Sequence, residues 1–171
     1  MQNELIRDYL TALGETMAEH VTAWAVDDTD EEPVLIFTVP APYDENTVIG
    51  YTITLEPVTN DVFLYDLVIT LITDVPEALF GDVSRVISVL NNCMIIGSFA
   101  LYEDTSEVVF RNGVLFSAET DVEAATVNIV QTLAAMENEV LDGMYLQMLI
   151  SGERTADELI AELCDIGGET A

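Results

Sequence analysis

Residues 95–116 constrain the fold of this chain more than any other stretch, because they have the pattern of an antiparallel β-hairpin. Two runs rich in β-branched and aromatic residues flank a short polar tip, which is typical of two strands joined by a turn. Because side chains two positions apart share a face of a strand, Phe99 and Leu101 are predicted to lie together, as are Val108 and Phe110. The hairpin therefore needs apolar cover, which the helical patterns before and after it can supply.

The same alternation predicts a larger sheet in the first half of the chain. Four more strands are expected, over residues 21–26, 34–39, 47–55 and 62–72. In the last of these, one face is wholly apolar, whereas Asp66 lies on the other. A sheet with one face much more apolar than the other favours helices on one side only and antiparallel strands.

Apolar residues at three- and four-residue spacing predict the helices. The expected helices cover residues 3–19, about 74–92 and 121–150, and a short last helix begins at Thr155. Gly143 is predicted to mark a bend or a weak point in the long helix, because glycine disfavours a helix interior.

The last helix has a specific start signal. Residues 151–154, Ser-Gly-Glu-Arg, interrupt the helical pattern, and Thr155 is followed three positions later by Glu158. This spacing is typical of a capping box, in which each residue's side chain bonds the other's backbone N–H.

These elements give the order α-β-β-β-β-α-β-β-α-α. We predict an α+β fold with an antiparallel sheet and helices packed mainly on one face, as a single domain over residues 1–171. At 171 residues, 50% of them hydrophobic, such a domain should bury roughly 70% of the surface of its unfolded chain.

The net charge of −28 restricts the possible partners. The chain has 32 acidic residues and four basic ones, all arginine, so direct binding to nucleic acid or to an anionic membrane is disfavoured. The acidity fits adaptation to high salt, a surface for a basic partner, or a mimic of a polyanion. Because screening relieves self-repulsion, we expect the melting temperature to rise from low to physiological salt.

Other features indicate a reduced, cytoplasmic protein. Cys93 and Cys164 are widely spaced in apolar helical contexts, so they are expected to be reduced core cysteines. The N-terminus lacks a signal-peptide pattern. No uncharged apolar stretch approaches the ~20 residues of a membrane span.

No motif predicts catalysis, metal binding or a cofactor. His20 is the only histidine, and its place at the end of the first helix favours a structural role. Residues 28–32 resemble the start of a calcium loop, but Pro33 and Val39 stand where the loop needs Gly and Glu, so a solvated turn is favoured. We expect a protein that is not an enzyme; a hydrolase using paired carboxylates is the alternative, beside the acidic nucleic-acid mimic.

Candidate partner-binding residues are few. Met136, Met144 and Met148 lie near one another on the predicted long helix, where they either fill the core or line a partner groove. Trp24 and the less apolar face of the sheet are the other expected contributors. An exposed strand edge or an apolar groove would hold the partner chain.

Several segments resemble the bacterial YbjN family. They are residues 89–92 (V-L-N-N), 97–101 (G-S-F-A-L) and 107–111 (E-V-V-F-R), with residues 148–152 leading into a helix start at 155–160. The resemblance covers about residues 76–163. Ala156 stands where that family usually has Pro, and Ser151 is a further departure.

The YbjN family resembles the type III secretion chaperone fold: a first helix, a curved antiparallel sheet, a helix between its halves and a C-terminal helix. Such chaperones are small, acidic, cytosolic dimers that hold an extended segment of another protein. The resemblance therefore implies a homodimeric protein-binding module, chaperone-like or regulatory, with an unidentified protein or peptide partner. It implies no catalytic residue and no cofactor.

Overall fold

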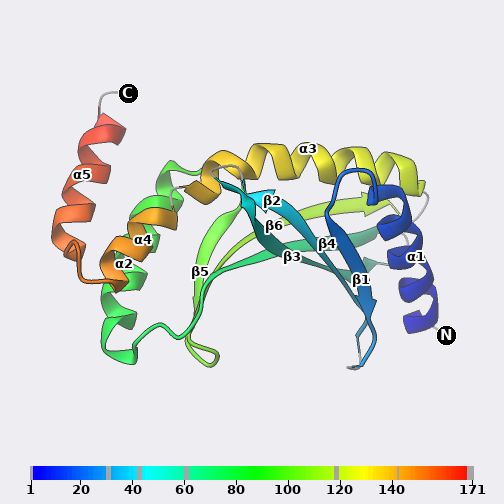
Figure 1. Cartoon of the computed structure of the whole chain (residues 1–171), viewed down its shortest axis with the longest axis horizontal. Coiled ribbons are helices and arrows are strands. Elements are labelled where there is room, and N and C mark those ends of the chain that lie inside the picture. Colours follow the sequence, from blue (N-terminus) through cyan, green and yellow to red (C-terminus); the bar gives the residue numbers. More distant parts are fainter. Residues whose placement is uncertain are drawn as a thin grey trace. The chain divides into compact units, whose positions relative to one another are not determined.

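The computed structural model shows an α+β fold with a six-stranded antiparallel sheet and five α-helices (Figure 1). The strand order across the sheet is β1-β2-β3-β4-β6-β5. The predicted fold class is therefore confirmed. The structure describes residues 2–29, 32–41, 44–59, 62–117, 120–141 and 143–168.

The observed elements follow the predicted order with two differences. A short 3₁₀ turn, η1, precedes the second helix, and the long helix is divided in two. In chain order the elements are α1 (Gln2–Met17), β1 (Ala23–Asp27), β2 (Val34–Ala41), β3 (Asp44–Thr59), β4 (Val62–Ile72), η1 (Glu77–Leu79), α2 (Phe80–Cys93), β5 (Ser98–Tyr102), β6 (Glu107–Ser117), α3 (Val122–Leu141), α4 (Gly143–Ile150) and α5 (Ala156–Gly168).

The chain forms two compact units. The first comprises residues 1–69 and 112–135, and the second comprises residues 70–111 and 136–171. The strands β4 and β6 each contribute residues to both units. The single domain stays a prediction, and each unit is described by itself below.

The core of the first unit lies on one face of strands β1 to β4. Alternate residues of these strands form rows across it, because the printed pairs Trp24–Phe37, Phe37–Tyr51 and Tyr51–Ile69 are in register. Phe37 and Tyr51 are fully buried, and their rings stack 5.2 Å apart. This bulky face excludes water from the sheet and needs a helical cover.

Helix α1 supplies part of that cover and lies beside β1 in Figure 1. Leu10, Leu13 and Met17 follow one stripe of the helix and are fully buried. The indole of Trp24 packs against Gly14 so closely that a Cβ at position 14 would overlap it. Glycine at this position therefore lets α1 approach β1.

Helix α3 joins the same core through polar contacts with α1. The hydroxyls of Thr16 and Thr126 lie 2.5 Å apart, and Thr126 also donates to the carbonyl of Val122. Tyr65 of β4 packs between Tyr9 and Phe116, with ring centroids 6.1 and 4.2 Å away. Burial raises the pKa of Tyr65 far above its ordinary value, so it remains a neutral core residue.

In the second unit, β5 and β6 form the predicted hairpin. Phe99 pairs with Phe110, and their rings meet edge to face at 5.0 Å. Leu101 pairs with Val108, so the predicted shared faces are confirmed. The turn has the positive φ of 58° at Ser106, whose carbonyl accepts the N–H of Val75.

Helix α2 seals the outer edge of β5. The Asn91 amide donates to the carbonyl of Phe99 at 2.9 Å, and its oxygen accepts the Phe99 N–H at 2.8 Å. The N–H and C=O of one strand residue point to the same side of the strand. Because both groups of Phe99 bond Asn91, they point away from β6. Asn91 of α2 therefore completes the strand edge at Phe99.

Gly143 is the first residue of α4, and residue 142, between α3 and α4, lies outside the described residues, so the predicted bend stays a prediction. Gly143 is buried, and a Cβ there would lie 3.2 Å from Leu71 and 3.6 Å from Phe99. The backbone at the start of α4 therefore approaches two core side chains of the second unit.

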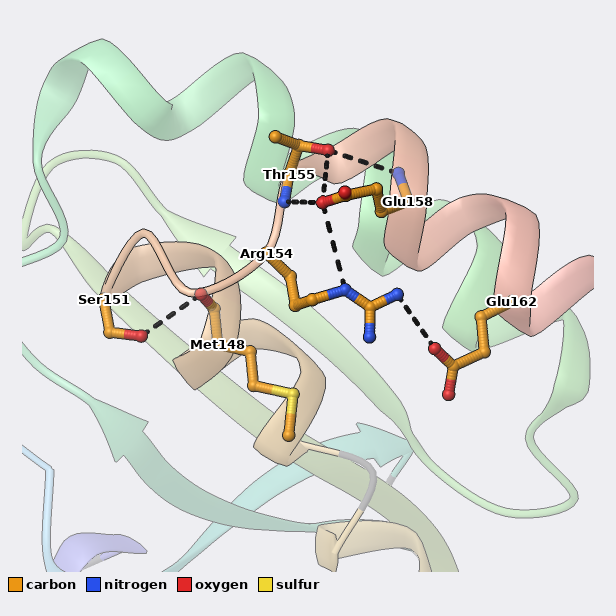
Figure 2. A network of polar contacts seen from close by, with 6 residues as sticks. All are labelled: Met148, Ser151, Arg154, Thr155, Glu158 and Glu162. Atoms are coloured by element: carbon orange, nitrogen blue, oxygen red, sulfur yellow. Dashed lines mark hydrogen bonds and ion pairs between the residues drawn. The ribbon is translucent and has the colours of Figure 1, made fainter.

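A fully bonded turn connects α4 to α5 (Figure 2). Gly152 has a φ of 75°, and its N–H bonds the carbonyl of Leu149 while the Glu153 N–H bonds that of Met148. This is a Schellman cap. The Thr155 N–H then donates to the Glu158 carboxylate at 2.9 Å, which confirms the predicted capping box.

Arg154 extends this network along α5. Its guanidinium donates to Glu162 at 3.0 Å and lies 3.9 Å from Glu158 (Figure 2). The hydrogen bonds from Thr155, together with the charge of Arg154, lower the pKa of Glu158. The turn thus satisfies the backbone groups that two helix ends would otherwise expose.

The prediction that the cysteines lie in the core is wrong. Cys93 and Cys164 are both free and exposed. Cys93 is the last residue of α2, beyond the buried stripe that ends at Leu90, and Cys164 follows the last buried residue of α5, Leu163. A helical apolar pattern indicates a covered face, but it does not fix how far along the helix that cover extends.

Candidate partner-binding surface

The face of the first unit's sheet opposite its core carries a continuous surface of small and apolar side chains. Alternation places these residues there, because each is one position away from a core residue. We call it the open sheet face, and it consists of Ala23, Ala25, Ile36, Thr38, Pro40, Val48, Gly50, Thr52 and Val68.

Strand register brings these residues into rows. Ala23, Thr38 and Gly50 form one row across β1, β2 and β3. The next row contains Ala25, Ile36, Thr52 and Val68. The surface is therefore contiguous over four strands, although its residues are spread over 46 positions of sequence between Ala23 and Val68.

Every side chain of the open sheet face is at least partly exposed. Ile36 retains 39% of its accessible surface and Val48 retains 52%. Ala23, Ala25 and Gly50 are also exposed. None of these nine residues is charged, although 21% of the chain is charged and charged residues concentrate on protein surfaces. Asp66, two positions before Val68 on the same side of β4, is buried. An exposed, uncharged and partly apolar surface is typical of an interaction site.

Carboxylates flank one end of this face. Asp27 and Glu56 continue it along β1 and β3, and both are exposed. The Asp27 carboxylate accepts the backbone N–H of Thr29 at 3.0 Å and its hydroxyl at 2.7 Å. These bonds lower the pKa of Asp27, so it is ionised at neutral pH.

The open sheet face ends at an edge strand. In the strand order, β1 has a neighbour on one side only among the described strands. An edge strand presents unpaired backbone N–H and C=O groups, which can pair with another extended chain. The face and the edge together can therefore offer apolar contact and main-chain hydrogen bonds.

The structure places Trp24 on the other side of β1. It is in register with buried Phe37 and packs against Gly14, so its ring is partly covered within the first unit. The predicted contribution of Trp24 to partner binding stays a prediction, and within the first unit its ring packs β1 against α1.

The three predicted methionines differ in exposure. Met136 is fully buried in the core of the second unit, whereas Met144 retains 53% of its surface. Met148 is half-buried on α4. Met136 lies on α3, whereas Met144 and Met148 lie on α4, and their role in partner binding stays a prediction.

Sequence reasoning identified the less apolar sheet face but missed its individual residues. Ile36 and Gly50 were the informative positions. Gly50 interrupts the alternating pattern of β3 with a residue that disfavours strands, and this was the signal available in the sequence.

The chemistry available on this surface is limited to packing and hydrogen bonding. Among the residues that the structure describes, no cluster of three or more His, Cys, Asp or Glu side chains could hold a metal ion. Within the same part of the chain, no helix is both long and apolar enough to cross a membrane.

Comparison with known proteins adds no assignment. No protein-family model matches the chain, and no curated protein matches it. The likeness to the YbjN family stays a prediction from the segments that carry it.

Proposed function

We propose that this chain is a non-enzymatic protein-binding module, chaperone-like or regulatory, that holds a polypeptide segment of a partner. The observation that carries the proposal is the open sheet face, with Ile36 and Val48 exposed on an uncharged surface of a very acidic protein. Recognition of another chain uses the features found there: apolar contact beside a free strand edge.

The family resemblance supports the same function and adds a homodimer in the cytoplasm. We include both in the proposal. Because each chain carries a charge of −28, two copies repel each other when they dimerise. The dimer should therefore become more stable as the salt concentration rises and screens this repulsion. Sedimentation equilibrium at low and physiological salt measures this directly.

Site-specific photo-crosslinking in the native cell tests the binding function. A photoreactive residue replaces Ile36 on the open sheet face, and in a matched control it replaces Val127 on α3, where 57% of the side chain is exposed. Both positions carry β-branched apolar residues, so they differ mainly in location.

We expect a discrete adduct with another polypeptide from position 36 and none from position 127. The adduct should disappear when Ala25, the neighbour of Ile36 in the same row, is replaced by Asp. No adduct from position 36, or equal adducts from both positions, would contradict the proposed function.

A further inference from the structure

Among the residues that the structure describes, none accounts for a glycine at position 50. It lies in the interior of β3, between β2 and β4, where glycine has no side chain to pack and weakens a strand. Its backbone does not have the left-handed conformation found at Gly97 and Gly152. The register of β3 shifts at residues 44–48, opposite Pro40 and Ala41 of β2, and at residues 57–59, whereas Gly50 itself is paired regularly with Thr38.

Crowding does not explain Gly50 either. A Cβ built at this position meets no described atom within 4 Å. At Gly97 and Gly143, by contrast, a Cβ would lie within 3.2 Å of a neighbouring atom. Within strands, glycine marks a bulge, a tight bend, or a place where another backbone or a ligand approaches closely, and the open space above Gly50 fits the last of these.

The row of small residues that contains Gly50 extends across the sheet. Thr38 and Ala23 complete its row, and both are small. Ile36 and Val48 stand beside the row and present larger apolar side chains. A partner can therefore bring its main chain close to β3 and pack its side chains against Ile36 and Val48.

Charge distinguishes the possible occupants. The contact surface is uncharged, but Asp27 and Glu56 flank one end of it and the chain as a whole carries −28. A second copy would bring the same excess of negative charge. A segment with Arg or Lys beside its apolar residues would instead be attracted and would pair with the flanking carboxylates.

We infer that the open sheet face binds an apolar, basic segment of a different protein, with its closest approach over Gly50 and with Arg or Lys directed toward Asp27 and Glu56. This inference rests on the proposed function and adds the place and the chemistry of the partner.

The test uses two variants with the same chemical change. Gly50→Val places a branched side chain at the centre of the contact, and Gly81→Val is the matched control, because a Cβ at Gly81 on α2 also meets no described atom within 4 Å. The probes are two short synthetic peptides of equal length, in which valine alternates with arginine or with glutamate. Titration calorimetry measures their binding to the full-length wild type and to both variants.

We expect the arginine peptide to bind the wild type and Gly81→Val alike, and the glutamate peptide to bind neither. Gly50→Val should bind the arginine peptide roughly tenfold or more weakly, because an added side chain holds the two surfaces apart. Its melting temperature should equal or exceed that of the wild type.

Three results would overturn the inference. Equal binding by Gly50→Val and the wild type would mean that the peptide responds to total charge alone. Unfolding of Gly50→Val would show that the fold itself requires glycine there. A dimer that strengthens with salt and is lost in Gly50→Val would identify the occupant as a second copy.

The outcomes also separate this inference from the proposed function. If the arginine peptide does not bind but position 36 still forms its adduct in the cell, the protein-binding function stands and the inferred chemistry is wrong. If neither is observed, the proposed function is contradicted as well.

Discussion

The two units differ at their edge strands and in what accounts for their glycines. In the second unit, Asn91 bonds the outer edge of β5, and a Cβ at Gly97 or Gly143 would crowd core side chains. In the first unit, β1 is an edge strand, and Gly14 is accounted for by Trp24, but Gly50 lies in the interior of a strand under open space. Packing therefore accounts for Gly14, Gly97 and Gly143, whereas no described residue accounts for Gly50.

The strongest test of this contrast replaces Gly97 with alanine. Its φ is 65°, and a Cβ would lie 2.6 Å from the Phe110 ring and 2.8 Å from the Arg111 carbonyl. Because alanine at this position would combine a strained left-handed backbone with overpacking, we expect the free energy of unfolding to fall by about 3 kcal/mol. Urea denaturation measures it. A loss no larger than that of an exposed substitution would break the contrast.

Replacing Asn91 with alanine tests the sealed edge. Two hydrogen bonds to the Phe99 backbone are lost in a half-buried site, so we expect a cost of about 2 kcal/mol. The Phe99 amide should also exchange its hydrogen faster. Asn92→Ala is the control, because Asn92 is exposed on the same helix. Equal effects of the two changes would mean that the edge is not sealed by Asn91.

A substitution in the turn between α4 and α5 should have a smaller effect on stability. Thr155→Ala removes the N-cap of α5 and should cost about 1 kcal/mol. Thermal unfolding at neutral pH measures the loss. Ser151→Ala is the comparison, since the Ser151 hydroxyl bonds only the Met148 carbonyl at an exposed position. A Thr155→Ala variant as stable as the wild type would contradict the capping role.

The same turn predicts a pH dependence. The pKa of Glu158 lies below its ordinary value of 4.5, so the ionised form is favoured in the folded state. Its contribution to stability is therefore complete above the ordinary pKa and is lost as the pH falls through the lower folded value. Glu158→Gln should be less stable than the wild type at neutral pH, and this difference should vanish in acid.

The smallest expected effect has the opposite sign. Gly50→Ala should leave the free energy of unfolding unchanged or raise it by about 0.5–1 kcal/mol, because alanine restricts the unfolded chain and meets no neighbour. Gly81→Ala, on α2 of the second unit, also meets no described neighbour and should behave similarly. A marked loss at position 50 would mean that the fold of the first unit itself requires glycine there.

Much of the fold could be predicted because the patterns were strongly periodic. The alternation of residues 62–72 gives β4 with its observed bounds, and the polar tip after residue 102 places the hairpin turn correctly. Short sequence motifs were equally informative where a residue type has one common structural role. Thr155 with Glu158 predicted the capping box that the structure contains.

The candidate surface was predicted less well, because it depends on what covers each face. The sequence did not show that Trp24 packs against Gly14 of α1, and its contribution to partner binding stays a prediction. Cys93 was expected to be buried, but α2 ends there. Periodicity assigns a residue to one face of its element, while burial depends on neighbours that are distant in sequence.

The packing of Trp24 against Gly14 gives the protein a built-in optical reporter. It is the only tryptophan in the chain, so intrinsic indole emission monitors the first unit alone, whereas far-ultraviolet ellipticity monitors the helices of both. Coincident unfolding curves from these two signals would show that the units melt together. Since the indole lies on the covered side of β1, its emission also follows the docking of α1 without a label.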